Sequence, residues 1–244
     1  MTTHITPHLA IYFGNATASI LPDEHRNAID GAELLRRSHF TPMQQALDAQ
    51  QLVFLHQVHG TEGMMVDATT AATFKPFSQD GDYLITNTTA ALGVLTADCL
   101  PVVIYDPQHH AAAMIHAGWR GSVNRVTVKA LEQMQQEFKT DADQVQIFYG
   151  PAAQQCCYEV TPEFLTYLEP FVYAEQLIAR RDGRLYFDTA LCNSLQLQEV
   201  GVPVSAINAT YTACTMCIPG FCSSRRQKEK NEAQMRQMTV VRLT

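Results

Sequence analysis

The chain has 244 residues, of which 46% are hydrophobic and 17% charged, and this composition indicates a globular protein with a sizeable core and excludes a disordered chain. Its formal net charge of −7 lacks the basic footprint of a general nucleic-acid binder. No stretch approaches the roughly 18 consecutive apolar residues of a membrane helix, and the N-terminus shows no signal-peptide pattern, so we expect a cytoplasmic protein without a membrane partner.

The first half of the chain predicts helices followed by strands. Apolar periodicity between His25 and Gln50 predicts one or two helices. Residues 51–60 (QLVFLHQVHG) predict a strand that ends in a turn at Gly60, and residues 63–67 predict a second short strand. Short apolar runs bounded by turn residues then predict buried strands over residues 82–86, 91–97, 101–106 and 111–117.

The second half mixes the two kinds of element. Helices are expected over residues 122–138, 162–171 and 190–201, and strands over 145–150, 204–208 and 238–243. Because helices and strands mix without strict alternation, and no linker or repeat divides the chain, we expect a single domain over residues 1–244. Its expected fold is an α/β (α+β) sandwich in which helices flank a mixed β-sheet.

Three residues with metal-binding side chains lie at the ends of predicted strands, each next to a turn: His59, Cys99 and His116. Strand ends at one edge of a sheet allow polar side chains to converge on a ligand. Two imidazoles and one thiolate form a zinc set that leaves the fourth tetrahedral position open, as in catalytic sites. His56 would point to the opposite face of the strand, which makes His59 the better candidate.

Two other interpretations of these residues stay open. Cys99 and His116 are also consistent with a small buried apolar residue and a satisfied core histidine, because they do not have the spacing of a local zinc motif. Alternatively, Cys99 is a nucleophile and His116 its base, without a metal. The adjacent Asp98 weakly disfavours that interpretation, since a carboxylate raises the pKa of a neighbouring thiol.

Three further residues are candidates for contacts with a substrate. Arg120 precedes a helix predicted to start near Ser122, which suits an anion pocket. Trp119, the only tryptophan, could stack on a base or cap the core. Arg225 begins a charged tail, expected to be mainly a solvated helix, from which it could reach a substrate anion.

The remaining cysteines include a CxxC motif formed by Cys214 and Cys217, with Cys222 nearby. A single CxxC is ambiguous between redox chemistry and metal binding. The neighbouring pair Cys156 and Cys157 could complete a four-cysteine zinc site with it, although nothing in the sequence requires this.

Four segments resemble, in order and spacing, the family labelled multicopper polyphenol oxidoreductase or laccase domain. They are QVHG (57–60), TADCLPV (96–102), HAGWRG (116–121) and GPAAQQCCYEV (150–160). This family is also described as purine nucleoside phosphorylases with adenosine deaminase activity, and one branch is described as a peptidoglycan editing factor.

The resemblance implies that His59, Cys99 and His116 bind zinc, with copper as the alternative metal. It implies phosphorolysis of adenosine, inosine, guanosine or methylthioadenosine, with phosphate as the second substrate, and deamination of adenosine. We therefore expect one set of catalytic residues, which includes two of the metal ligands, and one set of substrate-binding residues. The expected catalytic residues are Cys99, His116 and Arg120, and the expected substrate-binding residues are Asp82, Trp119 and Arg225.

Two segments depart from the family pattern. YFGNATAS (12–19) stands where a GGVS-type segment is usual, and FCSSRR (221–226) is followed by a long polar insert in which Arg236 is the candidate for a later arginine. These departures make the choice of substrate less certain than metal binding, and three alternatives stay open. They are copper-dependent phenol oxidation, hydrolysis of a peptidoglycan precursor, and binding of a nucleoside or metal without catalysis.

Overall fold

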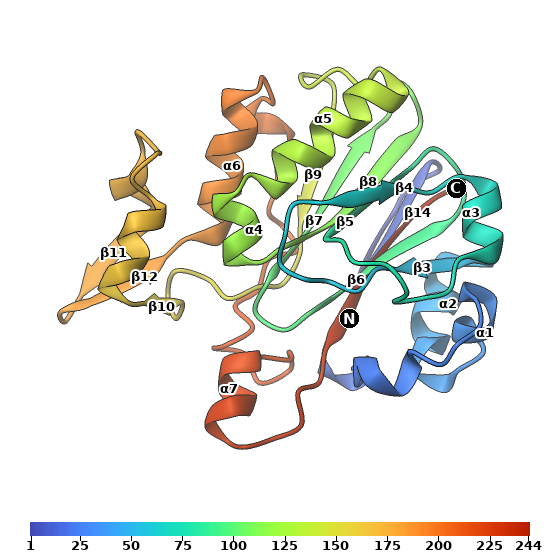
Figure 1. The fold of residues 1–244 in the computed structure, drawn as a ribbon, viewed down its shortest axis with the longest axis horizontal. Coiled ribbons are helices and arrows are strands. Elements are labelled where there is room, and N and C mark those ends of the chain that lie inside the picture. Colours follow the sequence, from blue (N-terminus) through green and yellow to red (C-terminus); the bar gives the residue numbers. More distant parts are fainter.

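The computed structural model describes every residue from Met1 to Thr244, with two larger β-sheets at its centre (Figure 1). The five-stranded sheet has the spatial order β1 (Thr2–Ile5), β2 (Leu9–Phe13), β14 (Gln237–Leu243), β6 (Ala91–Thr96), β3 (Leu52–Phe54). The six-stranded sheet has the order β13 (Ile207–Asn208), β9 (Gln146–Tyr149), β7 (Leu100–Asp106), β8 (Ala111–Ala117), β5 (Tyr83–Thr86), β4 (Gly63–Met65). Both sheets contain parallel and antiparallel pairs.

The two larger sheets pack face to face, because apolar side chains from both form one buried cluster. Phe13 and Val241 of the five-stranded sheet belong to this cluster together with Met114 and Phe148 of the six-stranded sheet. Burying one face of each sheet against the other is the arrangement of a β-sandwich.

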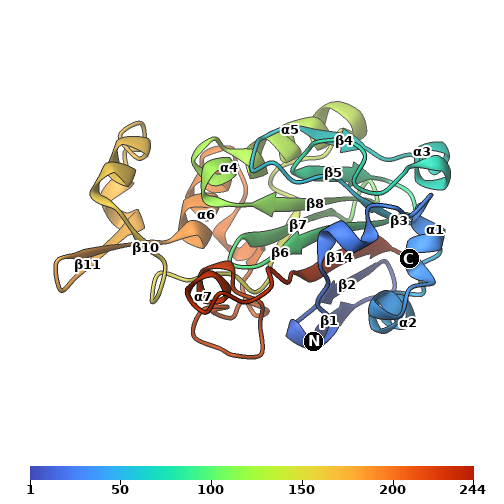
Figure 2. The ribbon, with the colours of Figure 1, turned by 60° about the horizontal axis from the view of Figure 1, so that its bottom comes forward.

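Helices cover the outer faces of the sandwich (Figures 1 and 2). The α-helices are α1 (Gly31–Leu35), α2 (Thr41–Leu47), α3 (Ala68–Thr73), α4 (Trp119–Val123), α5 (Val126–Phe138), α6 (Thr189–Glu199) and α7 (Ser224–Glu229). Leu131 of α5 and Leu197 of α6 join the core on the outer face of the six-stranded sheet. Leu34 of α1 and Met43 of α2 do the same for the five-stranded sheet. None of the helices has the length and apolar character that crossing a bilayer requires.

A third, three-stranded sheet stands apart from the sandwich (Figure 2). Its order is β10 (Glu159–Val160), β12 (Arg184–Phe187), β11 (Ile178–Arg181). It shares a small apolar cluster with two 3-10 helices, Pro162–Tyr167 and Ala174–Leu177, and Trp119 packs against that cluster. The remaining 3-10 helices are Ala16–Ala18, Pro22–His25, Ser38–Phe40 and Val204–Ala206.

The predicted mixed α/β class is confirmed, with most strands divided between the two packed sheets. Most predicted strands lie where the apolar runs placed them, because turn residues delimit β5 to β8 on both sides. The strand predicted over 51–60 is shorter and ends at Phe54. The helix predicted over 122–138 is two helices, since Arg125 between them adopts a left-handed φ of 68°. The segment 162–171 contains a 3-10 helix rather than an α-helix.

Candidate metal centre and active-site pocket

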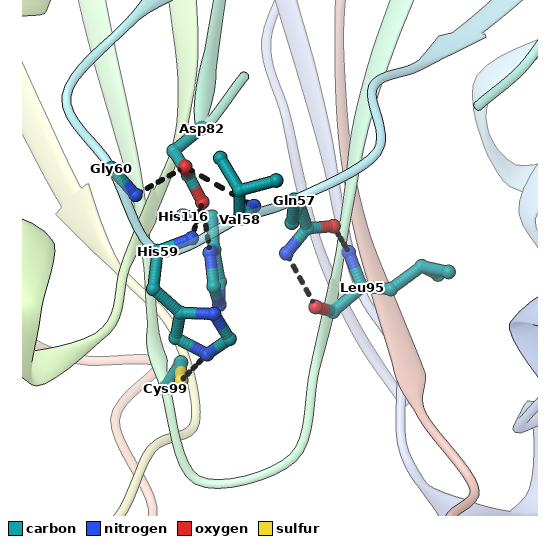
Figure 3. Close-up of polar contacts among 8 residues, drawn as sticks. All are labelled: Gln57, Val58, His59, Gly60, Asp82, Leu95, Cys99 and His116. Atoms are coloured by element: carbon teal, nitrogen blue, oxygen red, sulfur yellow. Dashed lines mark hydrogen bonds and ion pairs between the residues drawn. The ribbon is translucent and has the colours of Figure 1, made fainter. Parts of the chain in front are cut away.

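His116 is the most deeply buried of the candidate ligands and is held by a carboxylate behind it. It lies in β8, and its Nδ1 donates to Asp82 Oδ1 over 2.7 Å (Figure 3). Asp82 directly precedes β5, the neighbour of β8, and its side chain has no exposure. An N–H donated from Nδ1 leaves Nε2 as the nitrogen with a free lone pair, which is the state a metal-binding imidazole needs.

The same carboxylate shapes the loop that carries His59. Asp82 accepts hydrogen bonds from the backbone N–H groups of His59 (3.0 Å) and Gly60 (2.6 Å) as well as from His116 (Figure 3). Burial alone would raise the pKa of Asp82, but these hydrogen bonds hold it below its usual value. One ionised carboxylate thus positions both histidines.

His59 and Cys99 complete the set from two loops. His59 lies between β3 and β4 with a φ of 63°, and Cys99 lies between β6 and β7. His59 Nε2 is 3.8 Å from Cys99 Sγ, and the ligand atoms of His59, Cys99 and His116 all lie within 4.8 Å of one another. Zinc bonds of tetrahedral geometry would place such nitrogen and sulfur atoms about 3.5 Å apart. The residues present therefore fit a metal ion.

The space between the ligands is kept open by Gly118. A Cβ atom there would lie 2.8 Å from His59 Cδ2 and 3.2 Å from Cys99 Sγ. Gly118 has an ordinary φ of −69°, so the lack of a side chain serves close approach and not an unusual backbone conformation.

The electrostatics of the set favour a thiolate. Burial opposes the charged forms of both groups, but the facing His116 imidazole lowers the pKa of Cys99, and the Cys99 thiolate and Asp82 raise the pKa of His116. The thiolate is the form of cysteine that binds metals, and a metal cation at this position would take the place of the imidazole proton.

The three ligands open into a pocket of about 410 Å³, within the size range of small-molecule sites. Aromatic rings of Phe77, Trp119 and Tyr158 line part of it. Four basic side chains also line it: Arg26, Arg225, Lys228 and Arg236. The pocket thus combines a metal-binding set with surfaces suited to a flat ring and to an anion.

Asp98 joins the C-terminal segment to the metal-ligand loop. It precedes Cys99 in a left-handed conformation, with a φ of 85°. Its carboxylate accepts hydrogen bonds from Thr215 Oγ1 (2.8 Å), Ser223 Oγ (3.1 Å) and the backbone N–H of Arg225 (2.9 Å). These contacts place the first turn of α7, with Arg225, against the pocket.

The structure brings together most of the residues expected at the site. His59, Cys99 and His116 converge, and Trp119 and Arg225 line the pocket. Two of the expected residues lie outside the lining of this pocket. Asp82, expected to bind substrate, lies behind His116 with no exposed side-chain surface. Arg120, expected to be catalytic, does not line the pocket; its guanidinium stacks on Trp119, 4.5 Å from the ring centroid, on the exposed side of α4.

Sequence reasoning also missed residues of the pocket. Tyr158 and Lys228 line it without having been candidates, and Asp98 was considered only for its effect on the thiol. The signal for Tyr158 was available, because it lies within the family-like segment GPAAQQCCYEV. The contacts of Asp98 join residues more than 100 positions apart, which no local pattern reveals.

Replacing Asp82 with asparagine is expected to weaken metal binding about 10- to 100-fold, the usual cost of losing a carboxylate behind a histidine ligand. The amide keeps the shape but loses the charge that fixes the His116 tautomer. Metal affinity measured by competition with a chromogenic chelator checks this. Asp80→Asn is the matched control, because Asp80 pairs with His56 outside the ligand set. Equal affinities for all three proteins would contradict the positioning role.

Residues 32–244 match the model of the family described as multi-copper polyphenol oxidoreductase laccase. The chain belongs to this family. Its relatives include a purine nucleoside phosphorylase of Bacteroides thetaiotaomicron, 30% identical over 206 residues that cover 81% of this chain and 76% of the relative. Adenosine deaminase RL5 of an unknown prokaryotic organism is 31% identical over 193 residues, covering 75% and 73%.

Other relatives match over a shorter stretch. A purine nucleoside phosphorylase of Clostridium acetobutylicum is 32% identical over 139 residues, so the chain spans only 57% of the length of that protein. Among solved structures, the hypothetical protein YfiH of Bacillus licheniformis superposes with a TM-score of 0.79 at 20% identity, covering 97% of this chain and 93% of that one. This likeness supports the fold.

Proposed function

We propose that this family member is a zinc-dependent purine nucleoside enzyme. The reactions are phosphorolysis of adenosine, inosine, guanosine or methylthioadenosine, and deamination of adenosine. The observation that carries the proposal is the pocket itself, in which a His59/Cys99/His116 set shares one cavity with aromatic and basic side chains. Relatives named purine nucleoside phosphorylase and adenosine deaminase support the same substrate class.

The donor set favours zinc as the metal. Two imidazoles and one thiolate are ligands that zinc accepts, and three protein ligands are the usual number in catalytic zinc sites. A zinc ion held there would lower the pKa of a water molecule to roughly 7 and so supply a nucleophile at neutral pH.

In deamination, the residues of this chain hold the base and move protons. Trp119 and Phe77 offer faces on which a purine can stack. Burial raises the pKa of Tyr158, so that its phenol stays protonated and can donate a hydrogen bond. His56 lines the pocket outside the ligand set, and its Nδ1 is held by Asp80 over 2.7 Å. Its Nε2 is therefore free to carry a proton between water and the departing ammonia.

In phosphorolysis, the basic side chains hold the second substrate. Phosphate attacks C1′ of the ribose while the bond from C1′ to the base breaks and the base leaves with a proton. Arg225 is held in place at the pocket, because its guanidinium donates to Glu159 O and lies 4.6 Å from the ring centroid of Tyr158, which also lines the pocket. A guanidinium matches the geometry of phosphate oxygens, which suits Arg225 to orient the nucleophile.

Incubation of the purified protein with a panel of purine nucleosides, with and without phosphate, tests the proposal. Chromatography should show inosine from adenosine in both conditions and free base with ribose 1-phosphate only when phosphate is present. No product from any nucleoside in metal-loaded protein would overturn the proposal.

Replacing Arg225 with glutamine is expected to raise KM for phosphate roughly 10- to 100-fold, since a hydrogen bond to a charged group contributes about 1.5–3 kcal/mol. Deamination of adenosine, which uses no phosphate, should change far less. Arg120→Gln is the matched control, because Arg120 lies outside the pocket. Steady-state kinetics with phosphate as the varied substrate check this, and an equal effect of both substitutions would count against Arg225 as the phosphate ligand.

The family name favours a second candidate, copper-dependent oxidation of phenols. Copper prefers the same nitrogen and sulfur ligands. Copper content, visible colour and oxygen consumption with a phenol distinguish this reaction from nucleoside turnover. A muramyl-peptide precursor included in the substrate panel distinguishes peptidoglycan editing, and tight inosine binding without turnover would indicate a non-catalytic protein.

A further inference from the structure

Four of the seven cysteines meet outside the lining of the active-site pocket. Cys156 and Cys157 come from the loop between β9 and β10, and Cys214 and Cys217 come from the connection between β13 and α7. Their Sγ atoms all lie within 4.8 Å of one another. Cys217 Sγ is 2.8 Å from Cys157 Sγ and 3.5 Å from Cys156 Sγ, and all the cysteines are free thiols.

Backbone contacts hold the two cysteine pairs in this position. Ala152 pairs with Cys214 as an isolated parallel bridge, with hydrogen bonds from Ala152 N to Ala213 O (3.0 Å) and from Thr215 N to Ala152 O (3.1 Å). A further bond from Ile218 N to Cys214 O (3.1 Å) closes the CxxC turn. The fold therefore holds together the two backbone segments that carry the cysteines.

We propose that Cys156, Cys157, Cys214 and Cys217 bind a structural zinc ion, separate from the metal of the active site. Tetrahedral zinc with bonds of about 2.3 Å to sulfur places the sulfur atoms about 3.8 Å apart. This value lies within the observed range, which runs from 2.8 Å for Cys157 and Cys217 to a limit of 4.8 Å for the whole set. Four sulfur ligands fill the coordination sphere, and such closed sites stabilise a fold and do not bind substrate. Thiolates this close repel one another, and a divalent cation bonded to all four offsets much of that repulsion.

The cluster lies between the two chain segments that supply Tyr158 and Arg225 to the pocket. The Cys156–Cys157 pair directly precedes Tyr158, which lines the pocket. On the other side, Arg226 donates to Thr215 O (2.7 Å) and Met216 O (3.0 Å), and so fastens the CxxC turn to α7 next to Arg225. An ion that joins the two cysteine pairs would lock together the two segments that supply Tyr158 and Arg225.

Metal analysis of the reduced protein and two variants tests the proposal. The protein is produced with zinc in the medium and purified with a phosphine reductant. The number of zinc ions per chain is then measured by plasma mass spectrometry. We expect about two zinc ions in the wild type and about one in either Cys99→Ala or Cys217→Ser, as each variant loses one site. X-ray absorption of Cys99→Ala, in which only the cluster remains, should show four sulfur neighbours at about 2.3 Å.

Cys192→Ala is the matched control, because Cys192 is a buried thiol outside both sets, and it should keep the zinc content of the wild type. Three results would overturn the proposal. They are a Cys99→Ala protein without zinc, a zinc content unchanged by Cys217→Ser, and a wild-type chain whose intact mass shows a disulfide in this cluster after purification under reductant. The Cys99→Ala arm keeps the test independent of the active-site metal and of the nucleoside chemistry.

Discussion

Replacing Cys99 with alanine is expected to reduce purine nucleoside turnover roughly 1,000-fold, because a catalytic metal contributes several kcal/mol to the stabilisation of the transition state. The substitution removes the anionic ligand and leaves only His59 and His116 at the site. Metal analysis and initial rates with adenosine, measured on the same preparation, check both parts of this expectation.

The control for this substitution is Cys192→Ala, which also removes a thiol but lies away from the pocket. Cys99 is only half-buried, so its replacement should leave the fold intact, as circular dichroism would verify. If Cys99→Ala kept the metal and the rate of the wild type, the site would lie elsewhere. Loss of activity in both variants alike would point to a general loss of structure.

A methyl group at Gly118 should have the second largest effect, although this residue binds nothing itself. The added Cβ would lie 2.8 Å from His59 Cδ2, 3.2 Å from Cys99 Sγ and 3.7 Å from His116 Cε1. The His59 ring must then shift, and misplacing reacting groups by about 1 Å costs roughly 100-fold in rate. We expect Gly118→Ala to lose about that factor, together with a weaker affinity for the metal.

Gly220→Ala is the matched control, because a Cβ at Gly220 meets no atom within 4 Å. Both substitutions add one methyl group to a glycine without a left-handed φ. The difference between them is that the new methyl group meets the metal ligands at Gly118 and no atom within 4 Å at Gly220. If Gly118→Ala and Gly220→Ala turned over adenosine at the same rate, the space between the ligands would not have to stay empty.

The centre of the site was predictable because its strands carry a clear pattern. Apolar runs and turn residues delimit β7 and β8, so the placement of Cys99 and His116 at the same end of these two neighbouring strands follows from the sequence. His59 was predicted to lie at a strand end, and this prediction of its surroundings was wrong. It lies five residues beyond the end of β3, in a loop shaped by Asp82, and not at a strand end.

The rest of the pocket depends on contacts that a local pattern does not encode. Arg120 and Trp119 are adjacent in sequence, yet successive residues at the start of α4 point in different directions, so Trp119 alone lines the cavity. The position of Arg225 at the pocket depends on long-range contacts, among them the hydrogen bond from its backbone N–H to Asp98, 127 positions away. The grouping of four cysteines similarly joins pairs about 60 positions apart.

The zinc dependence of the enzyme is tested most directly by returning zinc to protein that a chelator has stripped. Adenosine turnover is the readout, and His116→Ala is the control that cannot rebuild the site. Without metal, the wild type should convert adenosine to neither inosine nor adenine. Zinc should restore both products, the second only with phosphate, while His116→Ala stays inactive. Full turnover by the stripped protein, or no turnover of any purine nucleoside by the zinc-loaded wild type, would contradict the account.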